Sequence, residues 1–222
     1  MDEEDSGLWL IGLGPGDLDL MTVAAVEKSK KCDYRFLEGY TALLPDNQLE
    51  KLTGLVGGFE KVMRPGVENP KEILDLAKKS KVALMVVGDP LQATTHVDLQ
   101  LRAEALGVNC HIIHGISITT IVTGAVGLQS YRFGRQVTLA YPYGEYLATS
   151  PFNLILENRE RNLHTLVLLD LDPTGMGVEI QKPMSPKVAI DVLIRSAKKI
   201  GVDIDDWKIV LCTDMGGENQ TI

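Results

Sequence analysis

Residues 82–96 read VALMVVGDPLQATTH, and this stretch predicts the fold more strongly than any other part of the chain. Residues 82–87 are continuously apolar and several are β-branched, which is typical of a buried strand. The Gly-Asp-Pro that follows at 88–90 ends the strand, because glycine and proline favour a turn. Two threonines at 94–95 are suitable caps for a helix. The stretch therefore predicts a strand, a loop and a helix in succession.

The same alternation continues on both sides of that stretch. We predict further strands at residues 8–13, 34–37 and 109–113, and helices at 21–31, 70–80 and 94–106. Thr22 is a suitable N-cap for the first of these helices. Val97, Leu101 and Ala105 recur at helical spacing and mark one apolar face of the third. Strands that alternate with helices indicate a mainly parallel sheet.

The second half of the chain repeats this pattern less regularly. Residues 114–117 resemble a hinge, and the apolar, small residues that follow favour a packed helix. Further strands are predicted at 136–140, 165–169 and 208–212, helices at 152–162 and 186–200, and loops at 142–151 and 172–186. We therefore predict an α/β fold with two α/β domains, residues 1–114 and 115–222. The first sheet is expected to be mainly parallel and the second mixed.

Composition narrows the class of protein. The 222 residues are 45% hydrophobic and 23% charged, which is ordinary for a soluble globular chain. The net charge of −8 argues against nucleic acid as the main partner, because phosphate binding needs a basic surface. Residues 1–6 are acidic and lack a signal-peptide pattern, and no apolar run is long enough for a membrane span. We expect a cytoplasmic protein that binds neither nucleic acid nor membrane.

Two glycine-containing loops follow predicted strands. The first has Gly12, Gly14 and Gly16, but the dinucleotide-binding fingerprint requires a glycine where Asp17 stands. This loop is either a tight turn or an edge where the backbone approaches a ligand closely. The second loop, at 88–90, lies where open α/β sheets bind ligands. Within it, Asp89 is either a ligand contact or a turn residue.

The histidines do not form a metal-binding pattern. His111 and His114 are three residues apart on a predicted strand, so they are expected on opposite faces. His96 and His164 are isolated, and the chain has no HExxH motif. We expect no metal. None of the serines lies in a GxSxG context, so a hydrolase triad is not expected either. The sequence names no catalytic residue.

Taken together, the motifs resemble the tetrapyrrole methylase superfamily. The most specific match is residues 87–96, and the others are 10–17, 31–34, 38–44, 113–118, 127–134 and 157–166. The resemblance covers nearly the whole chain, from Leu8 to Ile222. Within the superfamily, the similarity is to the branch whose members methylate a modified histidine of translation elongation factor 2.

This resemblance implies a tetrapyrrole methylase-like fold and S-adenosyl-L-methionine as methyl donor, held in the cleft between the two domains. It implies N-methylation of the 3-amino-3-carboxypropyl-histidine of elongation factor 2, in diphthamide biosynthesis, by a homodimer. Carried over by position, the donor contacts are Pro15, Asp89, Gln92, Ser117, Ile118, Leu169 and Met215. Superfamily members continue well past the position of Ile222, so the second domain is expected to be truncated.

Three alternatives remain open. A precorrin or cobalt-precorrin methyltransferase would share the fold and donor but lack the stretches at 88–96 and 131–134. An rRNA ribose methyltransferase of the superfamily would favour a basic face. A non-enzymatic nucleotide-binding domain would keep the first glycine loop but show no donor-dependent turnover, and a donor-binding measurement separates it from the other two.

Overall fold

A computed structural model describes residues 6–222, which divide into two compact units. The first unit contains the chain up to Ile118 together with Asp214–Gln220, and the second contains Thr119–Thr213 with Thr221 and Ile222. The division therefore falls four residues beyond the end of the first predicted domain, residue 114. It also assigns to the first unit a short segment, Asp214–Gln220, that the sequence placed with the second.

The first unit is built on a five-stranded sheet with the strand order β3-β2-β4-β1-β5. All neighbouring strands are parallel, which confirms the predicted parallel arrangement. The strands are β1 (Gly7–Gly12), β2 (Tyr34–Glu38), β3 (Glu60–Val62), β4 (Lys81–Val86) and β5 (Cys110–Ile113). The predicted strand at 82–87 corresponds to β4, the central strand of the sheet.

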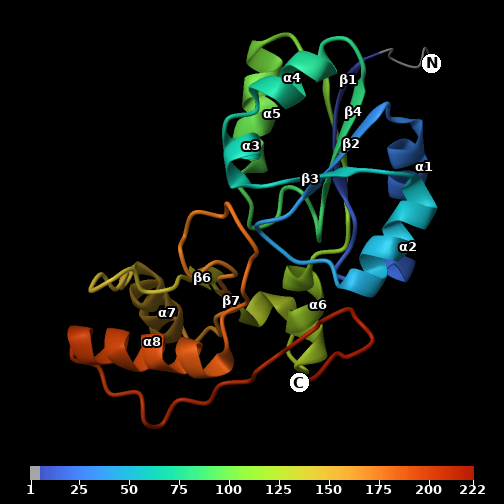
Figure 1. Cartoon of the computed structure of the whole chain (residues 1–222). Helices are drawn as coiled ribbons and strands as arrows, with labels where there is room; N and C mark the ends of the chain where they lie inside the picture. Colours follow the sequence, from blue (N-terminus) through green and yellow to red (C-terminus); the bar gives the residue numbers. More distant parts are fainter. Residues whose placement is uncertain (1–5) are drawn as a thin grey trace. The chain divides into compact units, whose positions relative to one another are not determined.

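Helices cover both faces of this sheet (Figure 1). Helices α1 (Val23–Lys31) and α2 (Asp46–Val56) lie on one face, and α3 (Arg64–Glu68), α4 (Lys71–Ala77) and α5 (His96–Ala105) on the other. Because successive side chains of a strand point to opposite faces, Leu84 packs with the second group and Met85 with the first. The inner strands β1 and β4 are therefore almost completely buried, since neither of their faces meets water.

A side-chain cap sets the beginning of α1. The Thr22 hydroxyl accepts a hydrogen bond from the Ala25 amide at 3.1 Å, which confirms the predicted N-cap. A short 3-10 helix, Leu18–Leu20, precedes it.

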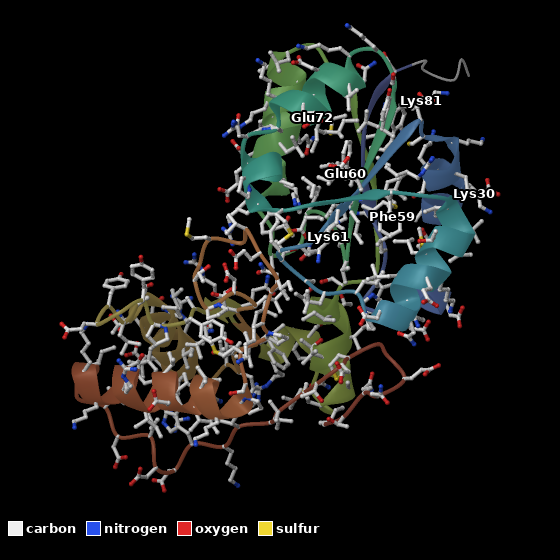
Figure 2. All side chains as sticks on the ribbon, in the orientation of Figure 1. Lys30, Phe59, Glu60, Lys61, Glu72 and Lys81 are labelled. Carbon is white, nitrogen blue, oxygen red and sulfur yellow. The ribbon has the colours of Figure 1, made fainter. Side chains whose placement is uncertain are left out.

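At the outer edge of the sheet, β3 carries exposed Glu60 and Lys61 (Figure 2). Charged side chains on an edge strand oppose pairing with another chain.

Helix α5 buries a different face from the one that the sequence indicated. Its buried side chains are His96, Leu99 and Ala103, whereas the predicted apolar face is exposed, with Val97 at 46% and Leu101 at 58%. Both sets have helical spacing, so periodicity alone could not choose between them. A histidine in the buried set hid the correct face, because histidine does not count as apolar in the pattern.

The second unit contains a smaller sheet of two parallel strands, β6 (Val137–Leu139) and β7 (Val167–Leu169). Its helices are α6 (Ile118–Ala125), which begins at the boundary, the 3-10 helix Ser130–Arg132, α7 (Ser150–Glu160) and α8 (Pro186–Ile200). Helix α8 matches the predicted range, since Ser185 caps its beginning and Gly201 ends it with φ of 81°. Ala189 and Val192 of α8 pack on Leu139 in the core of this unit.

The predicted strand at 208–212 is not a strand in the structure. Ile209 and Val210 are exposed, and an isolated bridge between Thr213 and Thr221 is the pairing found nearby. A strand needs a neighbour to satisfy its backbone groups, and an apolar run cannot supply one. Within residues 6–222 the second sheet therefore has only its parallel pair, and the mixed sheet that we expected is not seen.

None of the helices in the described part of the chain is long and apolar enough to cross a membrane.

Candidate functional site

The loops after β1 and β4 are joined by their backbones at the carboxyl edge of the first sheet. The Gly14 amide donates to the Gly88 carbonyl at 3.2 Å, and the Gly88 amide donates to the Gly14 carbonyl at 2.7 Å. Both glycines have φ of +84°, a conformation that side-chain-bearing residues rarely adopt. The helices that follow β1 and β4 lie on opposite faces of the sheet. Ligands bind at such a point in open α/β sheets.

The loop after β5 packs against these two at a distance that only glycine allows. A Cβ atom on Gly12 would lie 2.5 Å from the Gly115 nitrogen and 2.7 Å from the Gly88 oxygen. A Cβ atom on Gly115 would overlap the Gly88 oxygen and lie 2.8 Å from the Gly12 carbonyl carbon. Three glycines from three separate motifs therefore meet at one point.

The Asp89 carboxylate connects the loops after β4 and β5. Asp89 is 6% exposed, and one carboxylate oxygen accepts from the Leu91 amide at 2.9 Å. The other oxygen accepts from the Gly115 amide at 3.2 Å and lies 2.8 Å from Nδ1 of His114. The hydrogen bond from the Leu91 amide makes Asp89 a turn residue. The contacts with Gly115 and His114 also hold the loop after β5 in place. The structure therefore confirms Asp89 as a turn residue, and its contact with a ligand stays a prediction.

His114 is a site residue that sequence reasoning missed. It lies directly after β5 rather than within the strand, and its side chain is 72% exposed while its Asp89 partner is buried. The sequence considers it as one of two histidines in a rejected metal pair and as part of the matched stretch 113–118, and assigns it no role. The available signal was its position, since a polar residue directly after a parallel strand lies at the ligand-binding edge.

The beginning of α5 contributes a second, fully buried histidine. His96 begins the helix two residues after the predicted start, and its Nδ1 lies 3.1 Å from the Pro90 carbonyl. Burial lowers the pKa of His96, so the imidazole is held in its neutral form. The Thr94 hydroxyl also donates to the Pro90 carbonyl. These contacts fix the shape of the loop between Asp89 and the helix.

The structure places six of the seven predicted donor contacts in the first unit and one in the second. Asp89 and Gln92 lie in the loop after β4, and the Gln92 amide donates to the Asp89 carbonyl at 3.2 Å. The buried residue Met215 precedes Gly216, whose carbonyl accepts from the Asp17 amide at 3.3 Å, close to Pro15 in sequence. The remaining predicted contacts are Ser117 and Ile118 after β5, and Leu169 at the end of β7 in the second unit.

A buried carboxylate at the end of β2 was also not predicted. Glu38 is 1% exposed and accepts from the Tyr40 and Thr41 amides at 3.0 and 2.9 Å and from the Thr41 hydroxyl at 2.6 Å. Burial raises the pKa of Glu38, and the hydrogen bonds from Thr41 and Tyr40 oppose this shift. The Tyr40 ring in turn packs under the Arg64 guanidinium at 5.0 Å. The cluster stiffens the loop beside β4.

Glu38→Gln is expected to change how stability depends on pH. A carboxyl whose pKa is raised by folding stabilises the protein fully below its ordinary value of 4.5, and this stability is lost as pH rises through the folded pKa. Glutamine keeps an oxygen acceptor for the two amides and does not titrate. Relative to the parent, the variant should therefore become more stable as pH rises. Urea unfolding at about pH 4 and about pH 8 measures this, and a pH-independent difference would contradict it.

Among residues 6–222 no group of three or more histidine, cysteine, aspartate or glutamate side chains is placed to hold a metal ion.

Comparison with known families identifies the class of protein to which this fold and this glycine-lined edge belong. The family model of the tetrapyrrole (corrin/porphyrin) methylases matches residues 7–222. A solved structure described as diphthine synthase has a TM-score of 0.83 and 32% identity, and covers 96% of this chain and 79% of its own. A structure of a putative diphthine synthase from Entamoeba histolytica has a TM-score of 0.81 and 34% identity, and covers 97% and 82%. The chain therefore has the fold of a family of methyltransferases.

Curated relatives narrow the class further. A diphthine synthase of Methanosarcina mazei is 35% identical over 221 residues, which are 97% of this chain and 81% of the relative. A diphthine synthase of Methanocella arvoryzae is 42% identical over 168 residues, and this match spans 74% of the chain but only 65% of the relative. The chain belongs to the tetrapyrrole methylase family, and within it to the diphthine synthases. It is an S-adenosylmethionine-dependent methyltransferase of that type.

Proposed function

We propose that this protein methylates the amino nitrogen of a 3-amino-3-carboxypropyl side chain carried by a histidine of translation elongation factor 2, in diphthamide biosynthesis. The observation that carries the proposal is the near-complete match to diphthine synthases, at 35% identity over 97% of the chain. The methyl donor is S-adenosyl-L-methionine. The acceptor is the substrate of the diphthine synthase family.

We place the donor at the carboxyl edge of the first sheet. The glycines there fit a close ligand, because Gly14 and Gly88 carry no side chains that would block its approach and a Cβ atom on Gly16 would meet nothing within 4 Å. Asp89 adds a buried negative charge, which suits a donor that carries a positive sulfonium. The proposed contacts in the first unit are Pro15, Asp89, Gln92, Ser117, Ile118 and Met215, and Leu169 remains the predicted contact from the second.

The residues at this edge act by binding and orienting. The donor supplies a methyl group on a positively charged sulfur, and the acceptor supplies a nitrogen lone pair. Transfer between them requires in-line placement at near-attack distance and exclusion of water, which well-packed loops provide. The three glycine contacts and the Asp89 bonds keep the loops rigid, so little reorganisation is needed when the ligand binds.

The partner and the assembly state are part of the same proposal. Elongation factor 2 is a cytoplasmic protein, so we place this enzyme in the cytoplasm, and a net charge of −8 suits a protein partner better than RNA. We also propose a homodimer with the small-residue helix α6 near the interface. Light scattering at micromolar concentration should give twice the 24.3 kDa mass of the chain, and a monomer would contradict it.

The acceptor is tested with labelled donor and elongation factor 2 that carries the unmethylated side chain. Label should appear on that histidine and be absent from control factor that lacks the 3-amino-3-carboxypropyl group. Calorimetry should show donor binding whether or not the factor is present. Label on RNA or a tetrapyrrole, with the factor untouched, would overturn the acceptor and leave the donor site standing. Absence of donor binding would overturn both.

A further inference from the structure

The first unit holds an imidazole in a defined orientation at the proposed donor site. His114 follows β5 directly, so its backbone position is set by a strand that is paired with β1, and its side chain is 72% exposed. Nδ1 lies 2.8 Å from the Asp89 carboxylate, which is buried and tied to the Leu91 and Gly115 amides. The ring is therefore oriented by a group that cannot itself move freely.

The carboxylate decides which ring nitrogen carries the proton. An ionised carboxylate only accepts hydrogen bonds, so Nδ1 of His114 must be the donor in this contact. In the neutral ring the other nitrogen, Nε2, then has a free lone pair. Because Nδ1 faces Asp89, Nε2 lies on the opposite side of an exposed ring. This is the arrangement by which a buried aspartate prepares a histidine to accept a proton.

The other histidines of the chain do not meet these conditions. The chain has four. His96 is fully buried with Nδ1 on the Pro90 carbonyl, and His111 is stacked on Trp9 with ring centroids 4.8 Å apart. His164 lies in the second unit against Phe133. The Glu38 carboxylate does not meet these conditions either, because it is buried and already accepts three hydrogen bonds.

We propose that Nε2 of His114 accepts the proton that the acceptor amine must lose before methyl transfer, with Asp89 as the positioning residue. The inference rests on the proposed function. An ammonium group has no lone pair, so it first gives one proton to Nε2. The free amine then forms the new N–C bond while the donor's S–C bond breaks and its electron pair remains on sulfur. The product is a methylated ammonium, the thioether and a protonated His114, which returns its proton to water.

Two variants separate this role from a structural one. His114→Asn keeps an amide N–H that can reach Asp89 but has no base, and His114→Ala leaves space for free imidazole. Both should retain donor affinity within about twofold, and single-turnover methylation of elongation factor 2 should fall roughly 100-fold, in the range for loss of a general base. Added imidazole should restore part of the rate of His114→Ala. A variant that methylates at the parent's rate, or a loss that imidazole does not relieve, would overturn the proposal.

A second measurement does not depend on the acceptor. In protein labelled with nitrogen-15 in its histidines, the ring signals that disappear in His114→Asn report the tautomer of that ring. A neutral ring with its proton on Nδ1 and a bare Nε2 supports the proposal, and a proton on Nε2 overturns it. If the parent leaves elongation factor 2 unlabelled, the proposed acceptor is wrong, and the tautomer still decides the role of His114.

Discussion

Gly115→Ala is expected to destabilise the protein by roughly 3 kcal/mol and to abolish donor binding at ordinary concentrations. The added methyl group would overlap the Gly88 carbonyl oxygen and lie 2.8 Å from the Gly12 carbonyl carbon. Both obstacles are backbone atoms, one at the end of β1 and the other in the loop after β4, so neither can turn aside as a flexible side chain would. Relief would require the loop after β5 to separate from the other two. Urea unfolding and calorimetry with S-adenosyl-L-methionine measure the two effects.

Gly54→Ala provides the matched control. Gly54 lies inside α2, and a Cβ atom there would meet nothing within 4 Å. Because alanine is favoured over glycine in a helix, this variant should be more stable by about 0.5–1 kcal/mol and should bind the donor like the parent. If Gly115→Ala unfolded at the same urea concentration as the parent, the close contact of the three loops would be wrong.

Asp89→Ala is expected to weaken donor binding more than it weakens folding. Loss of one charge-assisted hydrogen bond costs roughly 1.5–3 kcal/mol, which corresponds to a roughly 10- to 150-fold loss of affinity. The Leu91 and Gly115 amides, which donate to the carboxylate at 2.9 and 3.2 Å, also lose their acceptor. Both lie in half-buried loops that water reaches, so the cost to folding should be smaller, about 1 kcal/mol.

Asp33→Ala is the control that separates an effect on donor binding from an effect on folding. The Asp33 carboxylate accepts from the Lys81 amide at 2.9 Å, so it also joins two strands, but at the amino ends of β2 and β4. Its loss should reduce stability slightly and leave donor affinity unchanged. Equal donor affinity in Asp89→Ala and the parent, with both folded, would show that Asp89 is only a turn residue and would remove it from the proposed site.

Local patterns account for most of the elements that the sequence predicted correctly. Continuous apolar runs predicted β1 and β4, and the helix at 186–200 was predicted over the range that α8 occupies. In each case the signal is contained in neighbouring residues, such as a serine cap before the helix and a glycine after it. The resemblance added the family and the donor, which the comparisons support.

The wrong predictions concern packing and pairing partners, which a local sequence pattern does not contain. The face that α5 buries depends on what the sheet presents to it, and the sheet accommodates His96 where periodicity favoured Val97. The apolar run at 208–212 has strand propensity but no neighbouring strand in the described residues. Propensity is a property of a segment, whereas pairing and burial are properties of its surroundings.

The sequence by itself determined the alternation of strands and helices, the glycines at the strand ends, the position of Asp89 after β4 and the family. Only the tertiary structure decided that Gly12, Gly88 and Gly115 touch, and that Asp89 orients His114 from 25 positions away in the chain. The reason is that parallel strands bring distant loops to one edge of a sheet. Which side chains meet at that edge depends on strand order, and strand order is set by packing on both faces of the sheet rather than by any one segment.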